Sequence, residues 1–228
     1  MNLVIFDVDG TLIDSVGVDD RCFVQAFDDA LGIRVAQTNW LEYQYQTDSG
    51  LALEIFCRHR GRRPTTVEVA VLENRFFVLL SRAIQTEPVA QKTGASRILD
   101  KLARRERWCP AIATGGWERT ARLKLASVGI DAAPIPMATA GDCLERTAII
   151  RTAVERAKVR LGVQSFASIT YVGDAVWDAR AAGQLGIAFL GVAGEQERTP
   201  LSAEGAQGVV PDFRDTAAFL RHLEEAAR

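Results

Sequence analysis

Six short apolar runs that stop at turn residues are the feature that most constrains the fold of this chain. They cover residues 3–6, 110–114, 134–139, 168–172, 187–190 and 208–210. The run at 134–139 is the weakest, whereas the others end directly at aspartate, glycine or proline. A short apolar run bounded by turn residues is typical of a buried β-strand.

Segments with helical periodicity separate these runs. They cover residues 95–107, 117–128, 145–161, 175–185 and a last segment that begins near 215. In 117–128, for example, Ala121, Leu125 and Val128 recur on one helical face. Alternation of short strands with helices predicts an α/β fold, a doubly wound, Rossmann-like parallel sheet.

Residues 16–88 interrupt that alternation. Phe23 and Phe27 share one helical face, and Leu72 and Phe76 share another, but clear strand patterns are few. We therefore expect residues 1–15 and 89–228 to form the α/β core. Residues 16–88 are expected to form an inserted α-helical cap.

Composition narrows the class of protein. The 228 residues are 48% hydrophobic and 25% charged, which is the balance of a chain that buries a core. A formal net charge of −2 disfavours nucleic acid as a partner, because such proteins neutralise many phosphates. No apolar stretch is long enough to span a membrane, the N-terminus lacks a signal-peptide pattern, and the four cysteines form no C-x-x-C pair. We expect a cytoplasmic protein that is a monomer or a weak dimer.

Two carboxylates follow the first predicted strand. Residues i and i+2 of an extended chain point the same way, so Asp7 and Asp9 face one spot. Open parallel sheets bind their ligands there, at the carboxyl ends of the strands. Two such charges repel each other unless a cation lies between them, and oxygen ligands suit Mg²⁺.

Other predicted strands end in residues that complement this pair. Thr114 offers a hydroxyl, and Gly115 lets its backbone N–H approach an oxyanion. Asp174 ends a further strand, and Asp178 lies one helical turn beyond it. Each of these residue types is common at turns and helix caps, so a single one does not indicate an active site. Their occurrence together at the ends of several strands does. Together they supply what metal-assisted phosphoryl transfer requires: a nucleophile, donors for phosphoryl oxygens and a cation site.

Three segments resemble the motifs of the haloacid dehalogenase-like (HAD) hydrolase superfamily. Residues 4–15, Val-Ile-Phe-Asp-Val-Asp-Gly-Thr-Leu-Ile-Asp-Ser, are similar to its first motif. Residues 112–116 resemble the second motif, and residues 171–178, with the form G-D-x-x-x-D, resemble the fourth. The helical insertion is similar to a C1-type cap, as in phosphoglycolate-phosphatase-like members, so the resemblance covers the whole chain.

The resemblance implies roles for the acidic residues. Asp7 would attack phosphorus and become an aspartyl phosphate. Asp9 would protonate the leaving alkoxide and then deprotonate the attacking water. Mg²⁺ would be held by the side chains of Asp7 and Asp174 and by the backbone carbonyl of Asp9.

The resemblance also implies a phosphate cradle. Thr114 and the N–H of Gly115 would hold phosphoryl oxygens, and Asp178 would orient the cluster. The third motif of the family usually supplies a lysine, but this chain offers Arg146 there. A permanently charged arginine can bind phosphate through two parallel hydrogen bonds, so arginine can replace that lysine. The alternative interpretation is an arginine exposed to solvent at the start of a helix.

These observations predict a Mg²⁺-dependent phosphatase that hydrolyses a small phosphorylated metabolite, a phosphate ester, through an aspartyl phosphate. Within the family, an aspartate at position 9 disfavours dehalogenase and phosphonatase chemistry. Two alternatives stay open: a sugar phosphomutase of the same fold, and a catalytically weak, phosphate-binding regulatory module.

The insertion is expected to act as a lid, hinged near residues 15–17 and 88–94. Its basic run, residues 58–63, would attract an anionic substrate if it faced the site, but a solvated helix end is the favoured interpretation. Trp40, Tyr43 and Tyr45 would line a pocket or, as we favour, pack in the core.

Overall fold

A six-stranded parallel sheet forms the centre of the protein in the computed structural model, which describes residues 1–227. Its strands are β1 (Asn2–Phe6), β4 (Trp108–Ala113), β5 (Met137–Ala138), β6 (Ile169–Gly173), β7 (Ala188–Val192) and β8 (Gly208–Val210). Their order is β5-β4-β1-β6-β7-β8, and every neighbouring pair is parallel. The predicted doubly wound sheet is confirmed, with β1 between β4 and β6.

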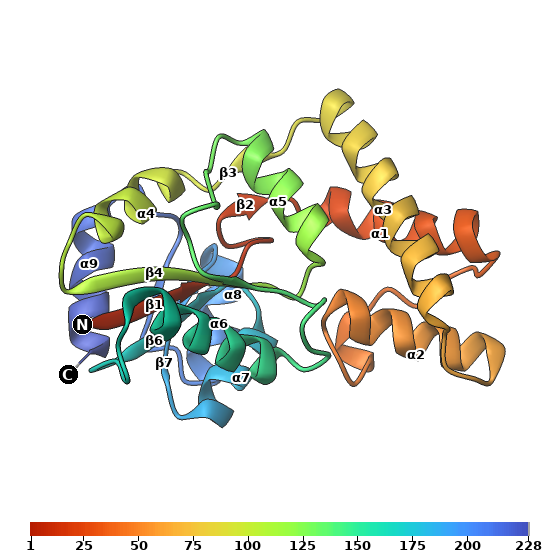
Figure 1. Cartoon of the computed structure of the whole chain (residues 1–228). Coiled ribbons are helices and arrows are strands. Elements are labelled where there is room, and N and C mark those ends of the chain that lie inside the picture. The colour runs from red at the N-terminus through yellow and green to blue at the C-terminus, as the bar shows by residue number, and fades with distance from the viewer. Residues whose placement is uncertain (228) are drawn as a thin grey trace.

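Helices cover both faces of the sheet (Figure 1). They are α4 (Ala95–Ala103), α5 (Glu118–Ser127), α6 (Arg146–Leu161), α7 (Val176–Leu185), α8 (Glu195–Ala203) and α9 (Thr216–Ala226). Alternate side chains of β1 enter different cores, because successive residues of a strand point to opposite faces. Val4 and Phe6 pack with α4 and α9, whereas Leu3 and Ile5 pack with α6 and α7.

Residues 16–86 form helices and no strand. They comprise α1 (Val16–Leu31), a 3-10 turn (Trp40–Glu42), α2 (Asp48–Arg60) and α3 (Thr66–Thr86). These helices lie to one side of the sheet (Figure 1) and share a separate hydrophobic cluster that includes Phe23, Phe27 and Phe76. The chain leaves and re-enters the sheet region through an antiparallel ribbon of β2 (Ile13–Asp14) and β3 (Ala90–Gln91). The insertion is thus helical as predicted, while its boundaries as a separate cap domain stay a prediction.

The structure differs from the expected elements mainly at their ends. The strand expected at 110–114 runs from Trp108 to Ala113, and the helix expected at 95–107 ends at Ala103. Helix α8 was not predicted, since it is polar and contains Pro200. None of the helices formed by residues 1–227 has the length and apolar composition needed to cross a bilayer.

Candidate active site

The carboxyl ends of three adjacent strands bring the predicted residues together. Asp7 follows β1, Thr114 follows β4 and Asp174 follows β6, and these strands are neighbours in the sheet. A cavity of about 160 Å³ lies at this edge. Six of the seven predicted residues line it: Asp7, Asp9, Thr114, Gly115, Arg146 and Asp174. The seventh, Asp178, is fully buried beside it.

Asp7, Asp174 and Asp178 form a carboxylate cluster, with one oxygen of each within 4.8 Å of the others. Burial and the Asp178 charge raise the pKa of Asp7 well above its ordinary value. Burial and Asp178 likewise raise the pKa of Asp174 to about 7. Like charges this close disfavour one another, and a divalent cation relieves that conflict. An all-oxygen set of this kind fits Mg²⁺.

Position 10 requires glycine because the loop after β1 passes very close to the Asp174 side chain. The φ of Gly10, +79°, lies in the region that favours glycine, and a Cβ there would lie 2.1 Å from Asp174 Oδ2. The neighbouring Thr11 hydroxyl donates to Asp174 Oδ1 at 2.9 Å. The loop after β1 therefore fixes the position of the aspartate that ends β6.

Arg146, at the start of α6, reaches the same cluster. Its Nη1 lies 3.3 Å from Asp7 Oδ1 and 3.0 Å from Asp178 Oδ1. Its Nη2 donates to the backbone oxygen of Gln46 at 2.8 Å, so it also contacts the inserted segment. Burial alone would lower the pKa of Arg146, but Asp178 and other neighbours raise it overall, so the guanidinium stays charged. Gly115 leaves room for it, because a Cβ there would lie 2.5 Å from Nη2.

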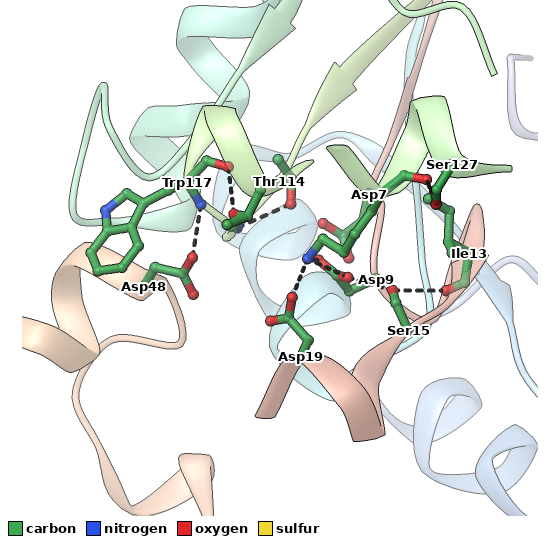
Figure 2. A network of polar contacts seen from close by, with 12 residues as sticks. Asp7, Asp9, Ile13, Ser15, Asp19, Asp48, Thr114, Trp117 and Ser127 are labelled. Carbon is green, nitrogen blue, oxygen red and sulfur yellow. Dashed lines mark hydrogen bonds and ion pairs between the residues drawn. The ribbon is translucent and has the colours of Figure 1, made fainter. Parts of the chain in front are cut away.

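Asp9 has different partners from Asp7, and Figure 2 shows its bond to Ser15. The Ser15 hydroxyl donates to Asp9 Oδ1 at 2.5 Å, and the ammonium of Lys124 lies 2.6 Å from the same oxygen. Lys124 belongs to α5 and is fully buried. It also bonds Asp19 of α1. Burial outweighs this lysine's attraction and raises the pKa of Asp19 to about 7.

A second aspartate of the insertion, Asp48, joins α2 to the loop after β4. Its backbone N–H donates to the backbone oxygen of Gly115 at 2.8 Å. Its Oδ2 accepts a hydrogen bond from the backbone N–H of Trp117 at 2.8 Å (Figure 2). The Trp117 indole N–H donates to Ser49 at 2.7 Å. Burial and the charge of Asp19 raise the pKa of Asp48 well above its ordinary value. The inserted helices are thus bonded directly to the loops that carry the site.

Comparison with known proteins identifies the family. A family model described as haloacid dehalogenase-like hydrolase matches residues 1–186. The chain belongs to this family. The resemblance of its motifs to those of HAD hydrolases is therefore confirmed, as is the prediction that it is a hydrolase. A search of the curated proteins found no match.

Solved structures share the HAD fold over nearly the whole chain. A hydrolase from Pseudomonas syringae is 25% identical with a TM-score of 0.75, and the alignment covers 100% of both chains. A protein described as a putative beta-phosphoglucomutase from Bacteroides vulgatus is 20% identical with a TM-score of 0.72, over 100% of this chain and 90% of that one. A predicted phosphoglycolate phosphatase from Haemophilus somnus is 20% identical with a TM-score of 0.65, over 96% of this chain and 97% of that one.

Three residues of this HAD site escaped the sequence analysis: Asp19, Asp48 and Lys124. A signal for two of them was present. Lys124 lies on the same helical face as Ala121 and Leu125, and Asp19 lies one turn before Phe23 on the apolar face of α1. A charged residue on an apolar helical face is a candidate for a buried ion pair. Asp48 carries no comparable signal.

The aromatic residues of the insertion divide between the two expected locations. Tyr43 is buried in the helical cluster, as favoured, and Trp40 packs against that cluster while also lining the active-site cavity. Tyr45 lines an adjoining cavity of about 330 Å³. The basic run at 58–63 lines neither cavity, so the interpretation as a solvated helix end holds.

Proposed function

We propose that this HAD hydrolase cleaves the phosphate monoester of a small metabolite, with Asp7 as nucleophile, Asp9 as acid and base, and Mg²⁺ as cofactor. The proposal rests mainly on the observation that Asp7 and Asp9 have different side-chain partners. Asp7 lies among two further carboxylates and Arg146, whereas Asp9 lies against a hydroxyl and an ammonium group. Two carboxylates in different surroundings serve different roles in acid–base and nucleophilic catalysis.

The reaction has two displacement steps. An oxygen of Asp7 forms a bond to phosphorus as the bond from phosphorus to the leaving oxygen breaks, which gives an aspartyl phosphate. Asp9 donates its proton to the leaving oxygen. A water then attacks phosphorus, Asp9 takes up the proton of that water, and the carboxylate of Asp7 is released with inorganic phosphate.

Charged and polar groups around Asp7 support this chemistry. Arg146 and the Thr114 hydroxyl would bind phosphoryl oxygens, with the N–H of Gly115 as a further donor. Mg²⁺ would be held by Asp7, Asp174 and the carbonyl of Asp9, with Asp178 alongside, and it would neutralise charge on the phosphoryl group. Asp178 is fully buried and accepts the Ala175 N–H at 3.1 Å, so it would orient Arg146 and Asp174 rather than touch the substrate.

The helical insertion, residues 16–88, would act as the cap domain. The bond from the Asp48 N–H to the loop after β4 and the bond that the Gln46 oxygen accepts from Arg146 of α6 close one side of the cavity. A closed cap excludes water from the first step and contacts the leaving group. The hinges would lie at the β2–β3 ribbon, which joins the segment to the core.

Hydrolysis of p-nitrophenyl phosphate with Mg²⁺ tests the proposal. The wild-type chain should release phosphate, and acid-quenched enzyme should carry a phosphoryl group on the peptide that contains Asp7. The Asp7→Asn variant should lose both properties. Turnover retained in Asp7→Asn would exclude Asp7 as the nucleophile, and an inactive wild type would favour a phosphate-binding regulatory module.

A further inference from the structure

We propose that the substrate carries no anionic group besides its phosphate, so that the leaving group is an uncharged or positively charged alcohol. This inference rests on the proposed function and concerns the other end of the same cavity. It is drawn from the charges that the inserted segment and the neighbouring core residues present to the leaving group.

The inserted segment supplies no cation to the cavity. Its lining residues are Val16, Asp19, Trp40, Gln46, Thr47, Asp48 and Leu51. The two charged residues of this set, Asp19 and Asp48, are both acidic, and the others are apolar, aromatic or neutral polar. A protonated carboxyl is neutral and an ionised one is negative, so neither form neutralises a second anionic group.

The cations contributed by the core are already paired. Arg146 is the one basic residue among those that line the cavity, and besides its contacts with Asp7, Asp178 and the Gln46 oxygen it is the cation that would bind the transferred phosphate. The ammonium of Lys124 is bonded to Asp9 and Asp19, and its side chain is fully buried behind them. A carboxylate or second phosphate on the leaving group would meet carboxyl groups without a free counter-charge, and like charges brought together in this way weaken binding.

The adjoining cavity does not change this conclusion. It shares Arg146, Gln46 and Trp177 with the active-site cavity and adds one further cation, Arg180. Arg180 is bonded to Glu204 at 2.6 Å, and the same cavity is lined by the acidic Glu145. The basic run, residues 58–63, lines neither cavity, and Arg62 within it pairs with Glu68 at 2.7 Å.

The same charges argue against the phosphomutase alternative. Transfer of the phosphoryl group from Asp7 to a hydroxyl of a hexose phosphate forms a bisphosphate. The second phosphate of that bisphosphate must then lie at the cap end of the cavity, among Asp19, Asp48 and Trp40. The residues of the inserted segment that line this part of the cavity include no basic side chain to neutralise a second phosphate, so water is the better-suited acceptor.

Three small phosphate esters test the inference: 2-aminoethyl phosphate, ethyl phosphate and 2-phosphoglycolate. They share a two-carbon leaving group that is cationic, neutral or anionic. With wild-type enzyme and Mg²⁺, kcat/KM for each of the first two should exceed that for phosphoglycolate by about tenfold to a hundredfold. Calorimetric binding of the three esters to Asp7→Asn, which should not turn them over, should give the same order.

Variants locate the origin of the discrimination. Asp48→Asn keeps an acceptor for the Trp117 N–H but removes the carboxylate, so it should narrow the ratio between ethyl phosphate and phosphoglycolate. Asp19→Asn is a second variant with the same expectation, and Arg62→Gln, at an exposed ion pair, is the control that should leave the ratio unchanged. Phosphoglycolate cleaved as fast as, or faster than, ethyl phosphate would overturn the inference while leaving the proposed phosphatase intact. Loss of all hydrolysis, including that of p-nitrophenyl phosphate, would instead overturn the proposed function.

Discussion

Substitution of Lys124 by methionine should destabilise the protein far more than an ordinary surface change. The ammonium group lies 2.6 Å from Asp9 and also bonds Asp19, and the lysine side chain is fully buried. Methionine has a similar length, so the main change is the loss of the positive charge. Removal of one partner from a buried ion pair typically costs about 3–5 kcal/mol, because a buried charge is left uncompensated. For a chain of this size that cost corresponds to a fall in Tm of about 6–20 °C.

The cost should depend on pH in a defined direction. The pKa of Asp19 is about 7 in the folded protein, above its ordinary value of 3.8, because burial outweighs the attraction of Lys124. The folded state therefore holds this proton more tightly than the unfolded chain, and stability falls as the pH rises from about 4 to about 7. Removing Lys124 raises that pKa further. The deficit of Lys124→Met should consequently be largest near pH 8 and smaller near pH 5.

Urea or thermal unfolding without metal ions measures this effect, and Arg122→Met is the matched control. Arg122 lies on the same helix but pairs with Glu118 at the surface, where the two side chains are 45% and 58% exposed. Loss of such a pair costs about 0.5 kcal/mol or less. A deficit for Lys124→Met no larger than that of Arg122→Met, or one that is the same at pH 5 and pH 8, would refute the reasoning.

Three further predictions concern the site. Asp9→Asn should lower kcat by about 10²–10⁴-fold for an alkyl phosphate. The loss should be much smaller for p-nitrophenyl phosphate, because its leaving group needs no proton, and steady-state rates on both esters measure the difference. Mg²⁺ at about 100 times its dissociation constant should raise the free energy of unfolding by about 2.7 kcal/mol at pH 8, which thermal unfolding with and without the ion measures. The rise in Tm should be smaller at pH 5, because the pKa of Asp174 is about 7 and protons then compete with the ion. Gly10→Ala should abolish that magnesium-dependent rise, because its Cβ would collide with Asp174, and isothermal titration with Mg²⁺ measures the lost affinity.

The sequence predicted the part of the site that lies on motifs and strand ends. Asp7, Thr114 and Asp174 follow adjacent strands, so the strand pattern alone was enough to bring them to one edge. Arg146 was harder, since nothing in its own segment distinguishes it from an exposed arginine. Its position was inferred from the order of motifs, and the structure brings its guanidinium to Asp7.

The contacts between core and insertion could not be predicted in the same way. Lys124 is separated from Asp9 by 115 residues and from Asp19 by 105, and no periodicity links segments so far apart. The β2–β3 ribbon escaped notice because two residues per strand are too few for an alternating pattern. Such features depend on how the helical insertion lies on the sheet, which local sequence does not determine.

The residues that select the leaving group are also the residues that hold the insertion against the core. Asp19 faces the cavity and bonds Lys124, and Asp48 faces the cavity and accepts the Trp117 N–H. A substitution that made this end of the cavity cationic, such as arginine at position 48, would remove a bond between insertion and core as it created a site for a second anion. A change of substrate charge at this end of the cavity would therefore also weaken the attachment of the insertion to the core, since selectivity and closure depend on the same two carboxyl groups.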